Sequence, residues 1–334
     1  IDKTKYGVKV QTSEYGKHGK HIIIDQGQTK IAGYTNREEG VFEEVPALIF
    51  GDHTRVIKYV DEPFFIGADG VKVLRSKDNN ANYKYLYYAL KNAKIPNTGY
   101  NRHFKWLKEI QINYPDRNDQ EVIVKVLDKV SDIIRKKQDK LARLDDLIQA
   151  RFIEMFGDPV HNDKGWNTAS VESVCKEIFG GGTPSKAHPE YYENGDIPWV
   201  SSKDMKTDVL FDSQIRINQM GLDNSTARIV PVNSVIMVIR SGILKHTLPV
   251  AINAVPLTIN QDLKAFAPGD RIITRFMAMQ FKIHEKDILS GVRAVTADNI
   301  EFNSLKQRLL IIPPLDLQNE FVEFAKQINK LKVT

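Results

Sequence analysis

Two stretches of the sequence decide the fold: FKWLKEIQINYPDRNDQEVIVKVLDKV at 104–130 and FNSLKQRLLIIPPLDLQNEFVEFAKQI at 302–328. Several residues of the first stretch recur in the second, each 198 positions later, among them Phe104/Phe302, Leu107/Leu305, Lys108/Lys306, Pro115/Pro313 and Gln120/Gln318. Each stretch reads as a polar loop, a short apolar strand, a proline and a helix start. Proline ends a strand and is well tolerated just before a helix. The common register therefore indicates an internal duplication.

The segment after Pro115 predicts one long helix over about residues 119–156. Apolar residues recur in it every seven positions, at Leu127, Ile134, Leu141, Ile148 and Met155. Such a heptad pattern is typical of a helix that packs on another helix. The alternatives are a core helix of one large domain and a spacer whose apolar stripe contacts a partner helix. The duplication supplies a partner, because Phe321, Ala325 and Ile328 occupy the matching positions.

Mixed segments flank the long helix. Short strand-like runs are followed by one helix in each half: strands at 21–25, 47–50, 55–60 and 70–74 with a helix at 83–92, then strands at 197–200, 234–240, 250–253 and 263–266 with a helix at 271–283. We therefore expect a mixed α/β protein with two globular domains joined by long, coiled-coil-like helices. The expected boundaries are 1–117 and 158–313 for the domains, and 118–157 and 314–334 for the helices.

Composition narrows the class of protein. Of the 334 residues, 42% are hydrophobic and 27% are charged, as in an average globular protein, which excludes a fibre or a disordered scaffold. No apolar run approaches the ~18 residues that a membrane-spanning helix needs. The net charge of +5 permits nucleic-acid binding without demanding it. The single cysteine, Cys175, cannot form an internal disulfide and favours a reducing cytosol.

Catalytic motifs are not found in the sequence. An adenine methyltransferase would need an Asn/Asp-Pro-Pro-aromatic loop, which neither 113–115 nor 158–160 supplies. The loop Gly180–Lys186 is similar to a phosphate-binding loop, but Lys186 follows a serine and not a glycine. The eight histidines show no zinc-binding spacing, so no metal site is indicated.

Polar turns that follow predicted strands are better candidates for function. They comprise 180–186, 199–204, 239–242 and 260–262, and they are rich in Arg, Lys, Ser, Asn and Gln. These side chains reach DNA phosphates and base edges. Each turn alone reads as an ordinary solvated loop, and it is their gathering at strand ends that favours a binding surface.

With these residues in view, the chain resembles the DNA-specificity (S) subunits of Type I restriction–modification systems over nearly its whole length. The resemblance is carried by GGGTPSKAHPEYYENGDIPWVSSKDMK (180–206), Gly221-Leu222, Asn224-Ser225, Arg240-Ser241-Gly242, GQTKIAGYTN (27–36), ALIFGDHTRVIKYVDEPFFIGADGVKVL (47–74) and MFGD (155–158). It implies two target recognition domains, each reading one half of a bipartite asymmetric DNA target. It also implies that two antiparallel helices separate these domains and dock methyltransferase subunits.

The resemblance also implies partners and candidate residues. A restriction/translocase subunit would join the complex, and the partners would use S-adenosylmethionine, ATP and Mg, whereas this cytoplasmic subunit would be non-catalytic and bind no cofactor. The heptad residues named above become the expected subunit interface. The candidate DNA contacts are Lys17, Lys20, Lys30, His53, Arg55 and Arg102 in the first domain, and Lys186, Ser202, Lys203, Arg240, Lys245, His246 and Gln261 in the second.

Two departures and two alternatives accompany this interpretation. Measured by the duplication, we expect about 30 residues of the first domain to be absent, and the second helix to be short. A coiled-coil interaction protein without DNA specificity would also explain the heptads. A fragment of a single-chain restriction–modification enzyme is the other alternative, although it requires a cofactor loop that the sequence does not show.

Overall fold

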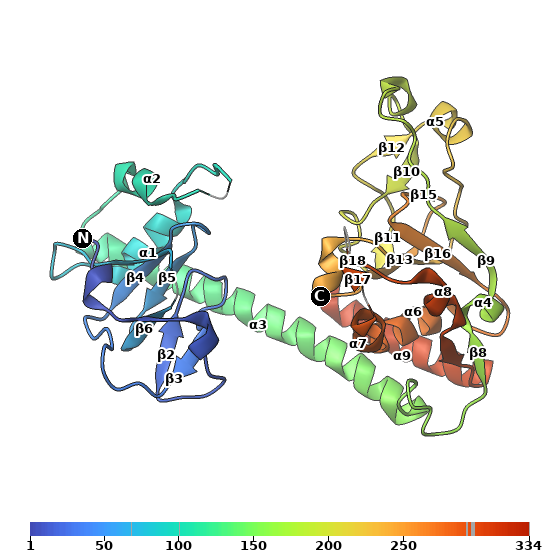
Figure 1. The fold of residues 1–334 in the computed structure, drawn as a ribbon, viewed down its shortest axis with the longest axis horizontal. Helices are drawn as coiled ribbons and strands as arrows, with labels where there is room; N and C mark the ends of the chain where they lie inside the picture. The colour runs from blue at the N-terminus through green and yellow to red at the C-terminus, as the bar shows by residue number, and fades with distance from the viewer. Residues whose placement is uncertain (68, 100, 292, 295–297, 334) are drawn as a thin grey trace. The chain divides into compact units, whose positions relative to one another are not determined.

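The computed structural model describes residues 1–67, 69–99, 101–291, 293–294 and 298–333 (Figure 1). The chain divides into two compact units, 1–138 and 139–334. Both contain strands and helices, so the predicted mixed α/β class is confirmed. No helix in the described ranges is long and apolar enough to cross a membrane.

The first unit contains two sheets. One has the order β1-β6-β2-β3, with strands Lys9–Val10, Phe64–Gly67, His21–Ile24 and Gly33–Thr35. The other has the order β5-β4-β7, with strands Ile57–Val60, Ala47–Gly51 and Val71–Leu74. Their apolar side chains form a common core that includes Ile24, Ile49 and Phe64. Helix α1 (Tyr83–Asn92) follows, capped by the Asn82 side chain, and then α2 (Phe104–Glu109).

The second unit is built around a five-stranded sheet of order β11-β14-β13-β16-β9. Its strands are Val209–Leu210, Val250–Asn253, Val235–Val238, Leu263–Pro268 and Cys175–Gly180. Three smaller sheets accompany it. The first has the order β12-β10-β15, with strands Arg216–Ile217, Ile197–Val200 and Thr258–Ile259. The other two are pairs: β19 (Leu309–Ile311) with β8 (Thr168–Ser170), and β17 (Arg293–Ala294) with β18 (Asp298–Asn299). The helices are α4 (Val171–Val174), α5 (Gln219–Asp223), α6 (Thr274–Ile283), α7 (Glu285–Ser290), α8 (Phe302–Gln307) and α9 (Leu315–Val333).

The two units share one topology. β2 pairs antiparallel with β3 and parallel with β6, and β10 pairs in the same way with β12 and β15. β4 lies between β5 and β7, as β13 lies between β14 and β16. Helix α1 follows β7, and helix α6 follows β16. The dissimilar sequences upstream of the repeated stretches therefore fold on the same scaffold.

Helix bounds and hydrogen bonds in the structure repeat at the 198-residue spacing found in the sequence. Helices α2 and α8 have bounds that match at both ends in this register, and α3 (Arg117–Phe156) and α9 begin at matching residues. Gln120 Nε2 donates a hydrogen bond of 2.8 Å to the carbonyl of Pro115, and Gln318 Nε2 donates one of 2.8 Å to that of Pro313. The duplication inferred from the sequence is thus repeated in the hydrogen bonding.

The long helix is α3, and its C-terminal part packs on α9 within the second unit. Phe152 and Phe321 have ring centroids 5.3 Å apart, and Arg151 forms an ion pair of 2.9 Å with Glu320. A second ion pair joins Asp145 to Lys332. Because the α9 partner moves from 332 to 320 as the α3 residue moves from 145 to 151, the two helices run antiparallel, as predicted.

Some predicted elements differ from the structure. The strand expected before Pro115 is not formed, because residues 111–113 pair with no strand in the described chain, whereas β19 pairs with β8. The helix predicted over 271–283 begins at Thr274. The Gln318 side chain explains the shift, since it binds the backbone of Arg271 and Ile273 and holds both outside the helix.

Candidate functional site

In the second unit, a glycine loop is locked between two strand ends. A Cβ on Gly181 would lie 1.7 Å from the carbonyl oxygen of Asn260, and one on Gly182 would lie 2.2 Å from the backbone nitrogen of Ala227. The Gly182 N–H donates to Ile259 at 2.9 Å, and Trp199 Nε1 donates to the Gly182 carbonyl at 2.8 Å. These two positions need glycine because the backbones approach too closely for a side chain.

The polar turns predicted from the sequence come together around this loop. Thr183 Oγ1 donates to Gln261 Oε1, which joins the turns 180–186 and 260–262. Arg240 forms an ion pair of 2.7 Å with Asp262, which adds the turn 239–242. The Asn260 N–H donates to the carbonyl of Val200 at 2.9 Å, which adds the turn 199–204. We call these four turns the polar rim of the second domain.

The candidate residues of this domain differ in how free they are to bind a ligand. Lys186, Lys203 and His246 are exposed, and no ion pair of theirs is found among the described residues. Arg240 is held by Asp262, and Lys245 Nζ lies 3.8 Å from Asp298 Oδ2. Gln261 is exposed on the rim, whereas Ser202 is half-buried. The unpaired cations are therefore the ones most available to an anionic ligand.

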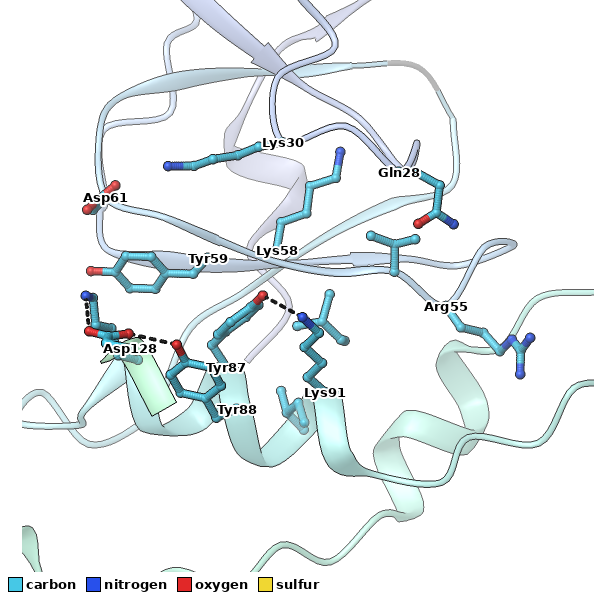
Figure 2. A pocket seen from close by; sticks show the side chains of 14 residues that line it. Gln28, Lys30, Arg55, Lys58, Tyr59, Asp61, Tyr87, Tyr88, Lys91 and Asp128 are labelled. Carbon is cyan, nitrogen blue, oxygen red and sulfur yellow. Dashed lines mark hydrogen bonds and ion pairs between the residues drawn. The ribbon is translucent and has the colours of Figure 1, made fainter. Parts of the chain in front are cut away.

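The first-domain candidates occupy separate places. Lys17 and Arg102 are exposed and form no ion pair within the described chain, and Lys20 is paired with Glu38 at 2.8 Å. His53 is half-buried, and its backbone N–H donates to Gln26 Oε1 at 3.2 Å. Lys30 and Arg55 line a groove of about 600 Å³ along β5 (Figure 2). Sequence reasoning found two of its residues but not the groove itself.

This groove, which we call the β5 groove, is rich in cations and tyrosines. Figure 2 shows Tyr87, Tyr88 and Lys91 rising from α1 toward β5, with Lys30 and Lys58 beyond the strand. Lys58 has a side chain only 5% exposed and lies 3.4 Å from Asp25 Oδ1. Burial lowers the pKa of Lys58, and the carboxylate of Asp25 partly opposes that shift.

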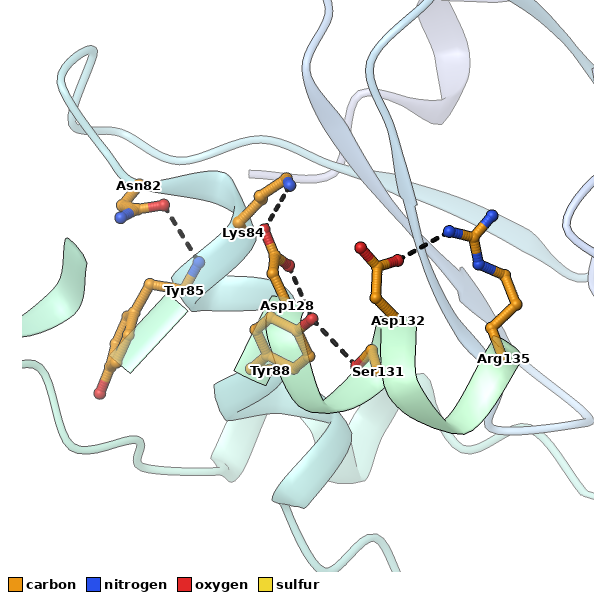
Figure 3. Close-up of polar contacts among 8 residues, drawn as sticks. All are labelled: Asn82, Lys84, Tyr85, Tyr88, Asp128, Ser131, Asp132 and Arg135. Atoms are coloured by element: carbon orange, nitrogen blue, oxygen red, sulfur yellow. Dashed lines mark hydrogen bonds and ion pairs between the residues drawn. The ribbon is translucent and has the colours of Figure 1, made fainter. Parts of the chain in front are cut away.

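The N-terminal part of α3 is fixed to the first domain by one carboxylate. Asp128 accepts hydrogen bonds from Lys84 Nζ at 2.6 Å and Tyr88 Oη at 2.8 Å, both on α1 (Figure 3). Burial favours the neutral form of this carboxyl, but the two hydrogen bonds prevail and hold the pKa of Asp128 below its usual value. The ionised Asp128 therefore anchors the helix.

The heptad residues of α3 fall into two groups. Ile134 and Leu141 are 53% and 37% exposed, and Leu127 is half-buried, so this part of the stripe can contact a partner. Ile148 is 3% exposed inside the core of the second domain, and Met155 packs against that core. Including Ile148 in a subunit interface was wrong, because its own domain covers it, whereas the half-buried Met155 stays a prediction. Sequence reasoning omitted the exposed Ile133, which lies beside Ile134.

The described residues offer no metal centre, since no group of three or more His, Cys, Asp or Glu side chains among them could hold an ion. Cys175 is free, and burial raises the pKa of its thiol to about 12, which leaves it protonated and unreactive.

The sequence profile of the Type I restriction modification DNA specificity domain matches residues 3–145 and again 163–334. The chain belongs to this family. It is 30% identical over 352 residues to the EcoR124I/EcoR124II specificity subunit of Escherichia coli, covering 98% of this chain and 83% of the relative. It is 24% identical over 249 residues to the MjaIX specificity subunit of Methanocaldococcus jannaschii, covering 68% of this chain and 56% of the relative.

The fold has a counterpart among solved structures. The Type I S subunit from M. genitalium aligns with a TM-score of 0.54 and 14% identity, covering 98% of this chain and 86% of the other. The predicted membership in the specificity-subunit family is confirmed by the profile and the E. coli relative. Both comparisons are to proteins named as specificity subunits, in agreement with the predicted non-catalytic role.

Proposed function

We propose that each of the two domains reads one half of a bipartite, asymmetric DNA target. The observation that carries this proposal is the single scaffold repeated with different loops at the strand ends. A shared scaffold places each reading surface in the same way, and different loops give each surface its own bases to contact. Two domains of one type reading different sequences would produce an asymmetric target.

In the second domain, the polar rim is the proposed reading surface. Lys186, Lys203 and His246 would contact phosphates, since they carry no ion pair within the described chain. Gln261 would read a base edge, because an amide both donates and accepts. Ser202, Arg240 and Lys245 would support this surface in their half-buried or paired positions. In the first domain, Lys17, His53 and Arg102 are the proposed contacts, and Lys20 would support them from its ion pair with Glu38. The other two candidates, Lys30 and Arg55, line the β5 groove instead.

We propose that the exposed stripe of α3 (Leu127, Ile134 and Leu141) docks methyltransferase subunits, with a restriction/translocase subunit joining the same assembly. Contiguous apolar side chains on a helix are costly to leave in water and mark a protein contact. S-adenosylmethionine, ATP and Mg would then be used by the partners and not by this chain. A DNA-recognition subunit of this kind would act in the cytoplasm, with the DNA it reads.

The test is an exchange of one domain. Residues 158–312 are replaced by the corresponding domain of another family member, and the methylated motif is sequenced in cells that carry the partner subunits. We expect one half-site to change and the other to stay as it was. A change in both half-sites would contradict independent reading. A chain that binds all duplexes equally would instead support the coiled-coil alternative.

A further inference from the structure

The β5 groove exists because one strand of the shared scaffold is missing from the first domain. In the second domain, β14 is flanked by β11, with Val209 paired to Ile252 and Leu210 to Asn253. The corresponding strand, β5, is an edge strand, and no backbone hydrogen bond to its outer side is found among the described residues. An uncovered strand edge presents N–H and C=O groups to whatever lies beside it.

The length of one connection explains the difference. In the second domain, residues 201–215 connect β10 to β12 and include β11. In the first domain, the equivalent connection from β2 to β3 is residues 25–32, which form no strand. This shorter segment only borders the groove, through Gln28 and Lys30.

We propose that the β5 groove binds an extended, acidic segment of another polypeptide, which adds to the edge of β5 as a strand. The second domain shows the geometry, since there the protein's own β11 occupies this place. Main-chain hydrogen bonds give such strand addition its affinity, and side-chain pockets on either side of the strand give it specificity.

The charge of the groove selects an acidic segment. Five cationic side chains line it, against two carboxylates. Lys84 and Asp128 pair with each other, and the buried Lys58 lies beside Asp25, which leaves three cations (Lys30, Arg55 and Lys91) against the single carboxylate of Asp61. Among the described residues Lys30 has no ion pair, and Lys91 Nζ only donates to Tyr87 Oη at 3.3 Å. Alternate side chains of an added strand point to opposite faces. Acidic side chains on the two faces would therefore meet the loop of Lys30 and the helix of Lys91, respectively.

A peptide fits this edge better than a nucleic acid does. The edge of a strand offers donors and acceptors in alternation, and a peptide backbone supplies both complements. Phosphate oxygens only accept hydrogen bonds, so a DNA backbone would leave the outward carbonyls of β5 unpaired. The tyrosines on α1 supply an apolar wall for the uncharged side chains of a bound strand.

A display library of random heptapeptides, selected on the immobilised full chain, tests the proposal. We expect the retained peptides to be enriched in Asp and Glu alternating with β-branched or aromatic residues, and depleted of proline. The double variant Lys30→Glu/Lys91→Glu should weaken binding of a selected peptide at least tenfold in fluorescence anisotropy. The matched control Lys77→Glu/Lys105→Glu changes two exposed lysines outside the groove and should leave the affinity unchanged.

Hydrogen exchange supplies a second readout, because an added strand should slow exchange of amides in residues 57–60, which contacts by side chains alone would not do. The proposal is overturned if the selected peptides show no acidic excess or bind both double variants equally. It is also overturned if duplex DNA displaces them and the groove variant loses DNA affinity in the same proportion, since the groove would then be a nucleic-acid surface. Loss of peptide binding with DNA binding retained leaves the proposed target recognition untouched.

Discussion

In each domain, a side chain from an earlier helix forms a hydrogen bond with the segment that leads into α3 or α9. The bonds lie at matching positions of the duplication, but different side chains form them. In the first, Tyr85 Oη donates to the carbonyl of Asn113 at 2.6 Å. In the second, Gln280 Nε2 donates at 3.0 Å to the carbonyl of Ile311, 198 positions later, and Gln280 Oε1 accepts from the N–H of the same residue. The duplicated scaffold thus preserves where the chain is tethered and lets the tethering side chain vary.

The glutamines of the repeated stretches show the same contrast. Gln318 binds Pro313, Arg271 and Ile273, which uses both ends of its amide. Gln120 binds Pro115 through its nitrogen, but its buried Oε1 has no hydrogen-bond partner in the described chain. Of the two glutamines, the copy in the second domain is therefore the more completely hydrogen-bonded, and that domain also has the covered sheet edge.

The largest effect is expected at the glycine loop of the second domain, residues 180–182. Gly181→Ala should destabilise the second domain by about 3 kcal/mol, because the new methyl group would overlap a backbone carbonyl and the strand ends would have to move apart. Thermal unfolding measures this. The control is Gly180→Ala, where only the flexible Lys264 lies near. Equal melting temperatures for the two variants would show that the loop is not locked.

The next prediction compares one substitution in the buried part of the α3 stripe with one in its exposed part. Ile148→Ala should cost about 3 kcal/mol of unfolding free energy, because it leaves a cavity in the second-domain core. Leu141→Asp should leave the fold intact and weaken co-purification with the methyltransferase subunit, because an exposed apolar contact is lost. Normal assembly of the Leu141→Asp chain would mean that the stripe is not the docking surface.

The α3 stripe also shows which features of the structure could be predicted from the sequence. The heptads and the 198-residue register predicted α3, α9 and their packing on each other, because long periodic patterns depend on local sequence, whereas the antiparallel direction followed from the family resemblance. Strands such as β1 and β3 were missed, since two or three residues carry no period and form only beside a partner. Whether a heptad residue is buried, as Ile148 is, or exposed, as Ile134 is, depends on which part of the helix the second domain packs against. The heptad pattern does not indicate that part.

The β5 groove was beyond sequence reasoning for a related reason. Its existence depends on a strand that is absent, and an absence shows only when the two domains are compared element by element. The polar rim was easier to anticipate, because turns rich in Arg, Ser and Asn at strand ends are visible in the sequence. The pairing of Arg240 with Asp262 was not, since these residues lie on different turns.

A smaller effect separates the two glutamines. Gln318→Leu should cost about 2 kcal/mol, because it leaves the N–H of Ile273 and the carbonyls of Arg271 and Pro313 without partners. Gln120→Leu should cost about 1 kcal/mol or less, because one hydrogen bond is lost while an unpaired buried oxygen is removed with it. Denaturant unfolding of both variants checks the order. A larger cost at Gln120 would show that its oxygen is satisfied.

The smallest effect concerns two neighbouring lysines of the first domain. Lys17 is unpaired in the described structure, whereas Lys20 is bound to Glu38 at 2.8 Å. If Lys17 contacts a phosphate, Lys17→Ala should weaken DNA binding by about 1 kcal/mol or less and reduce the slope of log affinity against log salt by about one. Lys20→Ala should leave that slope nearly unchanged, because the charge of Lys20 is already compensated and releases few counterions from DNA. Binding to the target duplex is measured over a series of salt concentrations, with far-UV circular dichroism to confirm folding. An equal change of slope in both variants would mean that the ion pair with Glu38 opens when DNA binds, and that pairing in the free protein is no guide to which lysines contact phosphates.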